Sequence, residues 1–287
     1  MFGPNVRSDE RGVYYHHREE MFRTILRTIE QLFIHKFGLE EYRILFITGS
    51  GTTVNESVIF GFRKRFRFLF DDATFGRRLA DLGSTHSNDK LPQSNWVAYP
   101  YYETSNSRLN LYKGDVPTFL DMVSAFPYYL PPKGTKIWTT VSSKQLGAYP
   151  VLGIVGIHKS LDLDEMFVRH QGSSLCLLDH LDKMKEGETP HTPAIPLYYD
   201  LLQSLAAFQL DEFRQKIGLR RRRVLHYIGV ENVIGGGPVI TFIANTKKLK
   251  RAAEECNLYK NSIGYQIFLW SGTDEEYDTF FKILESD

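Results

Sequence analysis

The chain has 287 residues and an almost even charge balance, with 35 lysines and arginines against 34 aspartates and glutamates and a formal net charge of +1 at pH 7. This balance produces no field of the kind that attracts nucleic acid or an anionic membrane. Cys176 and Cys256 lack CxxC spacing, and no run approaches the roughly 18 apolar residues of a membrane helix. We therefore expect a soluble, cytoplasmic protein without a metal site.

The first half of the chain begins with helical spacing of apolar residues over residues 13–37, which Gly38 ends. An apolar strand follows at residues 43–48, then the turn Gly49-Ser50-Gly51-Thr52, then a helix over residues 54–62. A strand, a glycine-rich turn and a helix in this order direct backbone N–H groups toward a phosphate. The pattern is neither a Walker A loop nor GxGxxG, so a tight connection without a ligand fits it equally well.

Further strands are predicted at residues 66–70, 96–102, 118–121, 138–141 and 152–157, with another helix opening at residues 73–78. Strands that alternate with helical segments indicate a largely parallel sheet covered on both faces. We therefore expect an α/β fold.

The pattern changes after the break at residues 189–193. Two helices are expected at residues 194–210 and 211–227, followed by strands at 238–243 and 265–270 and helices at 247–256 and 273–284. This predicts a large domain over residues 13–200 and a small α+β domain over residues 201–287, with residues 1–12 a candidate addition to the small domain. The run Arg220-Arg221-Arg222-Arg223 favours a solvated helix face. Adjacent His16 and His17 lack the spacing and the third ligand of a metal site.

Two side chains suggest chemistry. Lys144 follows a β-prone run, just past the expected end of a strand, and Asp121 closes the apolar run 119–121. A lysine that can form an imine and an aspartate that can hold a pyridinium nitrogen are the minimum equipment for pyridoxal 5'-phosphate (PLP) chemistry. Taken alone, the pair is weak evidence for a PLP site, because most lysines are solvated surface residues.

Several motifs in chain order resemble one family. They are the turn Gly49–Thr52, the ETSxGxxN-like segment Glu103–Asn110, the strand end Leu120–Ser124, the lysine segment Ser142–Gly147 and the turn His191-Thr192-Pro193. Together, over about residues 13–200, they resemble class V aminotransferases, closest to the 2-aminoethylphosphonate, serine–pyruvate and alanine–glyoxylate transaminases. The resemblance implies PLP-dependent transferase fold type I, a mostly parallel sheet sandwiched by helices with a small α+β C-terminal domain.

The resemblance also implies roles for the residues around the PLP ring. Lys144 would form the Schiff base and shuttle a proton, and Asp121 would pair with the pyridinium nitrogen. Phe75 falls where the family sets an aromatic ring against the cofactor face. Thr104 would donate a hydrogen bond to the phenolic oxygen of PLP.

A second group of residues is implied for the PLP phosphate. Gly51, Thr52 and Ser143 are the candidates for the phosphate cup, through backbone amides and hydroxyls. Thr192 would reach the phosphate of a neighbouring subunit. The resemblance therefore implies a homodimer with shared active sites.

The chain also departs from the family. Only residues 111–120 separate Asn110 from Asp121, where the family usually has a helix before the strand, so we expect that helix to be lost or reduced. Within residues 265–272, Gln266 stands where the family's carboxylate-binding arginine would be, and glutamine cannot supply a charged bidentate fork. Arg108 or Arg18 would be the substitute, while Gln266 is equally consistent with an ordinary strand residue.

We therefore expect an aminotransferase that moves an amino group from an amino acid or small amine to an oxo acid. A PLP-dependent lyase, desulfurase or decarboxylase on the same fold is a second interpretation. A desulfurase needs a mobile cysteine, whereas Cys176 and Cys256 lie in packing-type surroundings. A non-catalytic protein that kept the fold is a third interpretation, and the retention of both Lys144 and Asp121 counts against it.

Overall fold

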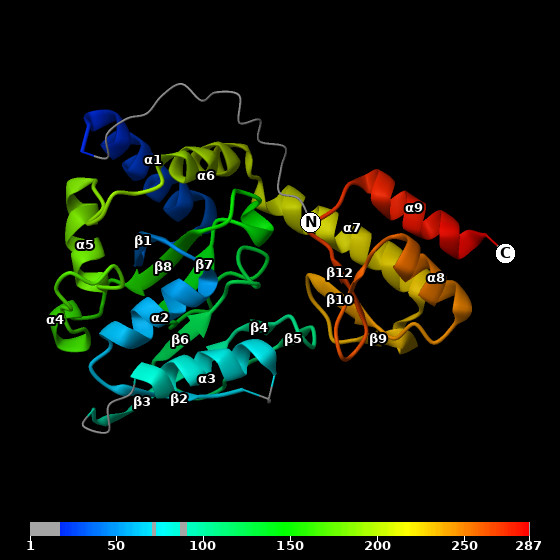
Figure 1. Ribbon diagram of the computed structural model, residues 1–287, viewed down its shortest axis with the longest axis horizontal. Helices are drawn as coiled ribbons and strands as arrows, with labels where there is room; N and C mark the ends of the chain where they lie inside the picture. The colour runs from blue at the N-terminus through cyan, green and yellow to red at the C-terminus, as the bar shows by residue number, and fades with distance from the viewer. Residues whose placement is uncertain (1–17, 71–72, 87–90, 287) are drawn as a thin grey trace.

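The computed structural model describes residues 18–70, 73–86 and 91–286 (Figure 1). The helices are α1 (Glu20–Phe37), α2 (Gly51–Gly61), α3 (Thr74–His86), α4 (Leu163–Met166), α5 (Leu177–Glu186), α6 (Ile195–Ala207), α7 (Leu210–Ile228), α8 (Lys247–Glu255) and α9 (Asp274–Glu285). The strands are β1 (Tyr42–Thr48), β2 (Arg65–Phe68), β3 (Gln93–Pro100), β4 (Tyr102–Glu103), β5 (Arg108–Leu109), β6 (Thr118–Asp121), β7 (Ile137–Val141), β8 (Leu152–His158), β9 (Val233–Ile234), β10 (Val239–Phe242), β11 (Tyr259–Lys260) and β12 (Tyr265–Phe268). Within the described ranges, each predicted helix and strand is present with small shifts of its ends.

The large sheet has the strand order β1-β8-β7-β6-β3-β2. Strands β2, β3, β6 and β7 pair in parallel, whereas β8 runs antiparallel to both of its neighbours. The expected mostly parallel sheet is confirmed. Because β3, β6 and β7 point the same way, their carboxyl ends share one edge of the sheet, where α/β proteins bind ligands.

Alternating side chains of the strands build a core on each face of the large sheet. In β1, Ile44 and Phe46 pack toward α1 and α6, whereas Leu45 and Ile47 pack toward α2, α3 and α5. This alternation is the period of two that a pleated strand imposes. The runs of consecutive apolar residues in these strands follow from burial on both faces.

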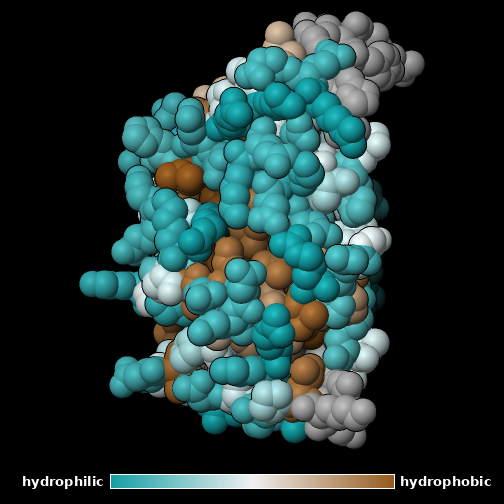
Figure 2. Space-filling view, turned by 90° about the vertical axis from the view of Figure 1, so that its left-hand side faces the viewer, coloured by the Kyte–Doolittle hydropathy of each residue, from teal (hydrophilic) through white to brown (hydrophobic). Residues whose placement is uncertain are grey.

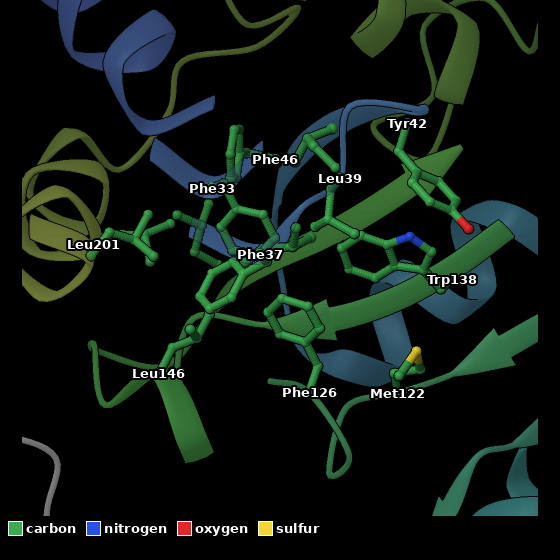
Figure 3. Packing of buried hydrophobic residues seen from close by; sticks show 14 of the residues in the cluster. Phe33, Phe37, Leu39, Tyr42, Phe46, Met122, Phe126, Trp138, Leu146 and Leu201 are labelled. Carbon is green, nitrogen blue, oxygen red and sulfur yellow. The ribbon is translucent and has the colours of Figure 1, made fainter. Parts of the chain in front are cut away.

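An aromatic stack anchors the segment that follows β6. The rings of Phe33 and Phe126 lie 5.2 Å apart, and those of Phe126 and Trp138 also lie 5.2 Å apart, both pairs nearly parallel (Figure 3). The indole of Trp138 needs the absence of a side chain at Gly156, where an added Cβ would lie 2.1 Å from a ring atom. Burial of Phe126 therefore holds the turn after Asp121 against the core.

The small domain consists of the antiparallel sheet β11-β12-β10-β9 and a separate core formed with α7, α8 and α9. One residue of its arginine run differs from the expectation. Arg220 is 5% exposed and donates hydrogen bonds to the carbonyls of Leu269, Ser271 and Gly272 and to Asp274. The prediction of a solvated face is wrong for Arg220, because these acceptors replace the water that its guanidinium loses.

The α6–α7 segment connects the two domains (Figure 1). Leu201 and Leu205 of α6 belong to the hydrophobic core of the large domain that contains α1. Ile217 and Val224 of α7 belong to the hydrophobic core of the small domain. This packing favours a break between α6 and α7, and the division at residue 200 stays a prediction. Residues 1–12, His16 and His17 lie outside the described residues.

The side of the large domain that faces away from the small domain is mainly hydrophilic, with hydrophobic residues gathered across its middle (Figure 2). In the part of the chain that the structure describes, no helix has the length and apolar composition needed to cross a membrane.

Candidate active site

A cavity of about 240 Å³ opens at the carboxyl end of β6, between the first turns of α2 and α3. Residues that are far apart in the sequence line it together. Among them are Gly51, Thr52, Phe75, Asp121 and Lys144, all of which were predicted to contact a cofactor. The structure therefore brings the centre of the predicted site into one cavity.

Lys144 lies in a turn after β7 with a left-handed backbone (φ 56°), which aims its side chain into the cavity. Its Nζ donates a hydrogen bond to Ser124 Oγ at 2.7 Å and lies 5.5 Å from the centre of the Phe75 ring. Burial lowers the pKa of the Lys144 amine, and the negative charges of Asp121 and Glu103 oppose the shift. A larger fraction of this amine is therefore unprotonated and nucleophilic than of an ordinary lysine.

Gln145 holds the Lys144 turn against the segment after β6. Its Nε2 donates to the carbonyl of Ser124 at 2.7 Å, and its Oε1 accepts from the backbone N–H of Tyr128 at 2.9 Å. Because Gln145 is buried, these bonds are shielded from water. They fix the short distance between Lys144 and Ser124.

Asp121 ends β6 at the floor of the cavity. Its Oδ2 accepts from Asn55 Nδ2 at 2.8 Å, its Oδ1 accepts from the Val123 N–H at 3.0 Å, and Thr139 Oγ1 donates to Asn55 Oδ1 at 2.5 Å. Burial raises the pKa of Asp121, while the two hydrogen bonds and the charge of Lys144 act in the opposite direction. The carboxylate is held rigidly, in a place where a cationic partner would stabilise it strongly.

The first turn of α2 presents N–H groups to the cavity. Ser50 caps the helix: its hydroxyl accepts from the Thr53 N–H, and its own backbone N–H donates to Thr53 Oγ1, which completes a capping box. Within the described residues, the N–H groups of Gly51 and Thr52 have no acceptor, and together with the helix dipole they favour an anion. An added Cβ at Gly51 would lie 2.7 Å from Val123, so glycine lets α2 approach the end of β6.

Glu103 fixes the beginning of α3. It is 1% exposed, and its Oε2 accepts from the N–H groups of Phe75 and Gly76, both at 3.0 Å. Its Oε1 accepts from the N–H of Ser105 at 3.1 Å and from the Ser105 hydroxyl at 2.5 Å. A carboxylate at a helix N-terminus satisfies free N–H groups and complements the dipole. Glu103 therefore positions the Phe75 ring beside Lys144.

Several solved structures that this chain resembles are of aminotransferases. The chain matches an aspartate aminotransferase from Thermus thermophilus with TM-score 0.78 and 20% identity, over 96% of this chain and 93% of that one. It matches an alanine–glyoxylate aminotransferase from Nostoc sp. with TM-score 0.78 and 16% identity, over 96% and 89%. A phosphoserine aminotransferase from Cytophaga hutchinsonii matches with TM-score 0.73 and 15% identity, over 94% and 90%.

The chain has PLP-dependent transferase fold type I. The predicted fold is thereby confirmed. No protein-family model matches the sequence, and no curated relative matches it either. At these identities the likeness establishes the fold, and the function has to be argued from the site.

Three predicted cofactor residues of this fold type I chain do not line the cavity. Thr104 is buried beside Glu103, Ser143 is half-buried beside Lys144, and Thr192 is exposed in the loop between α5 and α6. Their roles stay predictions. The absence of a helix between β5 and β6 agrees with the expectation for residues 111–120.

The predicted substrate residues also lie outside the cavity lining. Gln266 is buried in β12, where its Nε2 donates to the Thr104 carbonyl at 2.6 Å and to Thr241 Oγ1 at 2.8 Å. It joins the loop after β4 to the small sheet. Arg108 is exposed in β5, and the charge of Arg18 acts on Glu188.

The sequence analysis missed four residues of the site, Asn55, Arg78, Glu103 and Ser124. Two of them carried a detectable signal, because Asn55 follows Gly51 by four residues and Arg78 follows Phe75 by three, the spacings that place side chains on one face of a helix. The other two belong to segments that the motifs already covered. The contacts of Glu103 with α3 and of Ser124 with Lys144 join segments 20 or more residues apart, so they could not be predicted.

Proposed function

We propose that this chain is a PLP-dependent aminotransferase of class V type, which transfers an amino group from an amino acid or small amine to an oxo acceptor. The observation that carries the proposal is the convergence of three groups in one cavity. They are the amine of Lys144, the carboxylate of Asp121 and the free N–H groups at the start of α2. A PLP-bound phosphoserine aminotransferase from Trichomonas vaginalis has the same fold, with TM-score 0.74 and 15% identity.

The residues present fit PLP. The N–H groups of Gly51 and Thr52 would donate to its phosphate, and the ring of Phe75 would lie against its face. Asp121 would accept a hydrogen bond from its pyridinium nitrogen, a partner that offsets the cost of burying the carboxylate. Lys144 would attach it covalently. When bound, PLP supplies an electron sink for the substrate carbon that bears the amine.

The chain itself supplies proton transfer and positioning. With its lowered pKa, the Lys144 amine can take a proton from the substrate carbon and return it, as a general base with a pKa nearer to neutrality does. Ser124 accepts a hydrogen bond from this amine and so orients it. The hydrogen bonds from Thr139 to Asn55 and from Asn55 to Asp121 keep the Asp121 carboxylate in a fixed position.

The alternative reactions of the same fold receive less support. Neither Cys176 nor Cys256 lines the cavity, and Cys176 is fully buried in the core under α2 and α5. A persulfide-accepting cysteine would have to reach the site, so a desulfurase is disfavoured. The spectroscopic test below separates a lyase, a decarboxylase and a non-catalytic protein from an aminotransferase.

We propose further that the protein is a cytoplasmic homodimer. The exposure of Thr192 suits its expected contact with the site of a second subunit. Free Cys176 and Cys256 suit a reducing compartment. Sedimentation of the purified protein tests the dimer, and a monomer that is fully active would contradict it.

The test of function is an absorbance spectrum of the protein with PLP, recorded during additions of aminoethylphosphonate, alanine, serine, glutamate and amines without a carboxylate. An aminotransferase shifts the visible band of the lysine-bound cofactor toward the amine form and releases an oxo product. Release of carbon dioxide or of an eliminated group would indicate a decarboxylase or lyase. Lys144→Ala should abolish the band, whereas the matched control Lys159→Ala, at an exposed position, should keep it. Absence of any band in the wild type would support a non-catalytic protein.

A further inference from the structure

Arg78 lies on α3, on the helix face that borders the cavity. Its Cζ is 5.4 Å from the centre of the Phe75 ring, the same ring that Lys144 Nζ approaches to 5.5 Å. The pKa of Lys144 is lowered mainly by burial, and the positive charge of Arg78 lowers it further. A second cation therefore borders the amine that would carry out the chemistry.

Within the described part of the chain, the guanidinium of Arg78 has no hydrogen-bond or ion-pair partner. The two nearby carboxylates are already engaged. Asp121 accepts from Asn55 and Val123, and Glu103 accepts from the beginning of α3 and from Ser105. The five N–H donors of Arg78 thus remain available to an anion that enters the cavity.

The small domain contributes no comparable cation to the described lining. Gln266 occupies the place where an arginine was expected, and its amide is bonded to Thr104 and Thr241. Arg220 and Arg221 of α7 donate to backbone carbonyls of their own domain. Lys144 and Arg78 are the cations of the described lining, and Lys144 is reserved for covalent chemistry.

We propose that Arg78 binds the carboxylate of the amine substrate. The substrates are then α-amino acids, and the large domain recognises their carboxylate. This inference rests on the proposed function. A planar guanidinium receives a carboxylate through two parallel hydrogen bonds, and the cation–π contact with the Phe75 ring helps to hold Arg78 beside the cavity. The phosphate of PLP has its own donors at the start of α2, so Arg78 is left for the substrate.

The experiment compares Arg78→Gln with the control Arg77→Gln, which removes the same charge from an exposed position of α3 outside the cavity lining. The probes are matched pairs, alanine with ethylamine and serine with ethanolamine, which differ by the carboxylate. We expect Arg78→Gln to raise the KM for alanine and serine about tenfold, the effect of losing one partly solvated charged hydrogen-bond pair, with a small change in kcat. Arg78→Lys should recover part of this loss, and Arg78→Gln should affect ethylamine and ethanolamine much less than alanine and serine.

Binding of propionate, an unreactive carboxylate, gives a readout independent of turnover. Calorimetry should show weaker propionate binding in Arg78→Gln and unchanged binding in Arg77→Gln. The inference is overturned if propionate binds equally well to Arg78→Gln, if alanine and ethylamine lose activity in parallel, or if Arg78→Gln loses PLP, which would make the cofactor phosphate its ligand. A wild type that takes up no PLP would refute the proposed function instead, and the propionate comparison would still decide the role of Arg78.

Discussion

The Nζ of Lys144 and the Oγ of Ser124 are joined by a 2.7 Å hydrogen bond between the turn after β7 and the turn after β6. Both turns are tied together by Gln145 and anchored by the buried ring of Phe126. The position of the candidate catalytic amine is thus set by two neighbouring strands. A hydroxyl at this place can orient the amine during proton transfer.

Ser124→Ala removes this acceptor and leaves the fold intact. We expect kcat to fall about fivefold to tenfold, the effect of one hydrogen bond of about 1 kcal/mol, with little change in Tm. Steady-state kinetics and thermal denaturation measure the two effects. An unchanged kcat would show that Ser124 plays no part in orienting Lys144.

The lowered pKa of Lys144 predicts selective reaction with PLP near neutral pH. Brief incubation with PLP, borohydride reduction and peptide mapping should label Lys144 ahead of the other lysines, because a larger fraction of its amine is unprotonated. Exposed Lys159 is the internal reference. Equal labelling of the two lysines would contradict the prediction.

Asp121→Asn should retain PLP and lose most turnover, by about 100-fold or more, because a neutral amide cannot keep the pyridine nitrogen protonated. The fold should survive, since a flip of the Asn55 amide lets Asn55 accept from the new amide and donate to Thr139. Spectra with PLP and kcat measure the two effects. Full activity would refute the pairing.

The raised pKa of Asp121 predicts a pH dependence of stability in the PLP-free protein. The folded state holds this proton to higher pH than the unfolded state, so the contribution of Asp121 to stability falls as pH rises from the usual carboxyl range through the raised pKa. Asp121→Asn should therefore have a higher Tm than the wild type at neutral pH, and the difference should vanish in acid. Asp115→Asn, at an exposed carboxylate, should show no such difference.

Glu103→Gln replaces the carboxylate that caps α3 with a group that has one acceptor oxygen. We expect a loss of about 1–2 kcal/mol of stability and weaker PLP binding, because the beginning of α3 no longer fixes the Phe75 ring. Ser105→Ala removes one donor from the same carboxylate and should have a smaller effect. Denaturant unfolding measures the loss of stability, and PLP titration measures the loss of affinity for PLP. Equal effects of the two variants would contradict the capping role of Glu103.

Arg220→Met should destabilise the small domain by about 2–4 kcal/mol, because buried carbonyls of Leu269, Ser271 and Gly272 would lose their donor. Arg222→Met, at an exposed position of the same helix, is the control and should change stability by less than about 0.5 kcal/mol. Denaturant unfolding measures both. Similar small effects of the two substitutions would mean that water can replace Arg220.

The sequence by itself determined the order of elements and the mostly parallel sheet, because apolar periodicity, glycine turns and strand ends are properties of short segments. Lys144, Asp121 and the start of α2 were expected at the candidate site from the resemblance to class V aminotransferases, and the structure brings them into one cavity. The tertiary structure alone decided what Glu103, Gln266 and Arg220 contact, and it alone placed Arg78 at the cavity. Gln266 contacts Thr104 from 162 residues away, and Glu103 caps a helix 28 residues before it. Whether a polar side chain caps, bridges or faces a ligand depends on which distant segment packs against it, and the order of residues along the chain does not specify that packing.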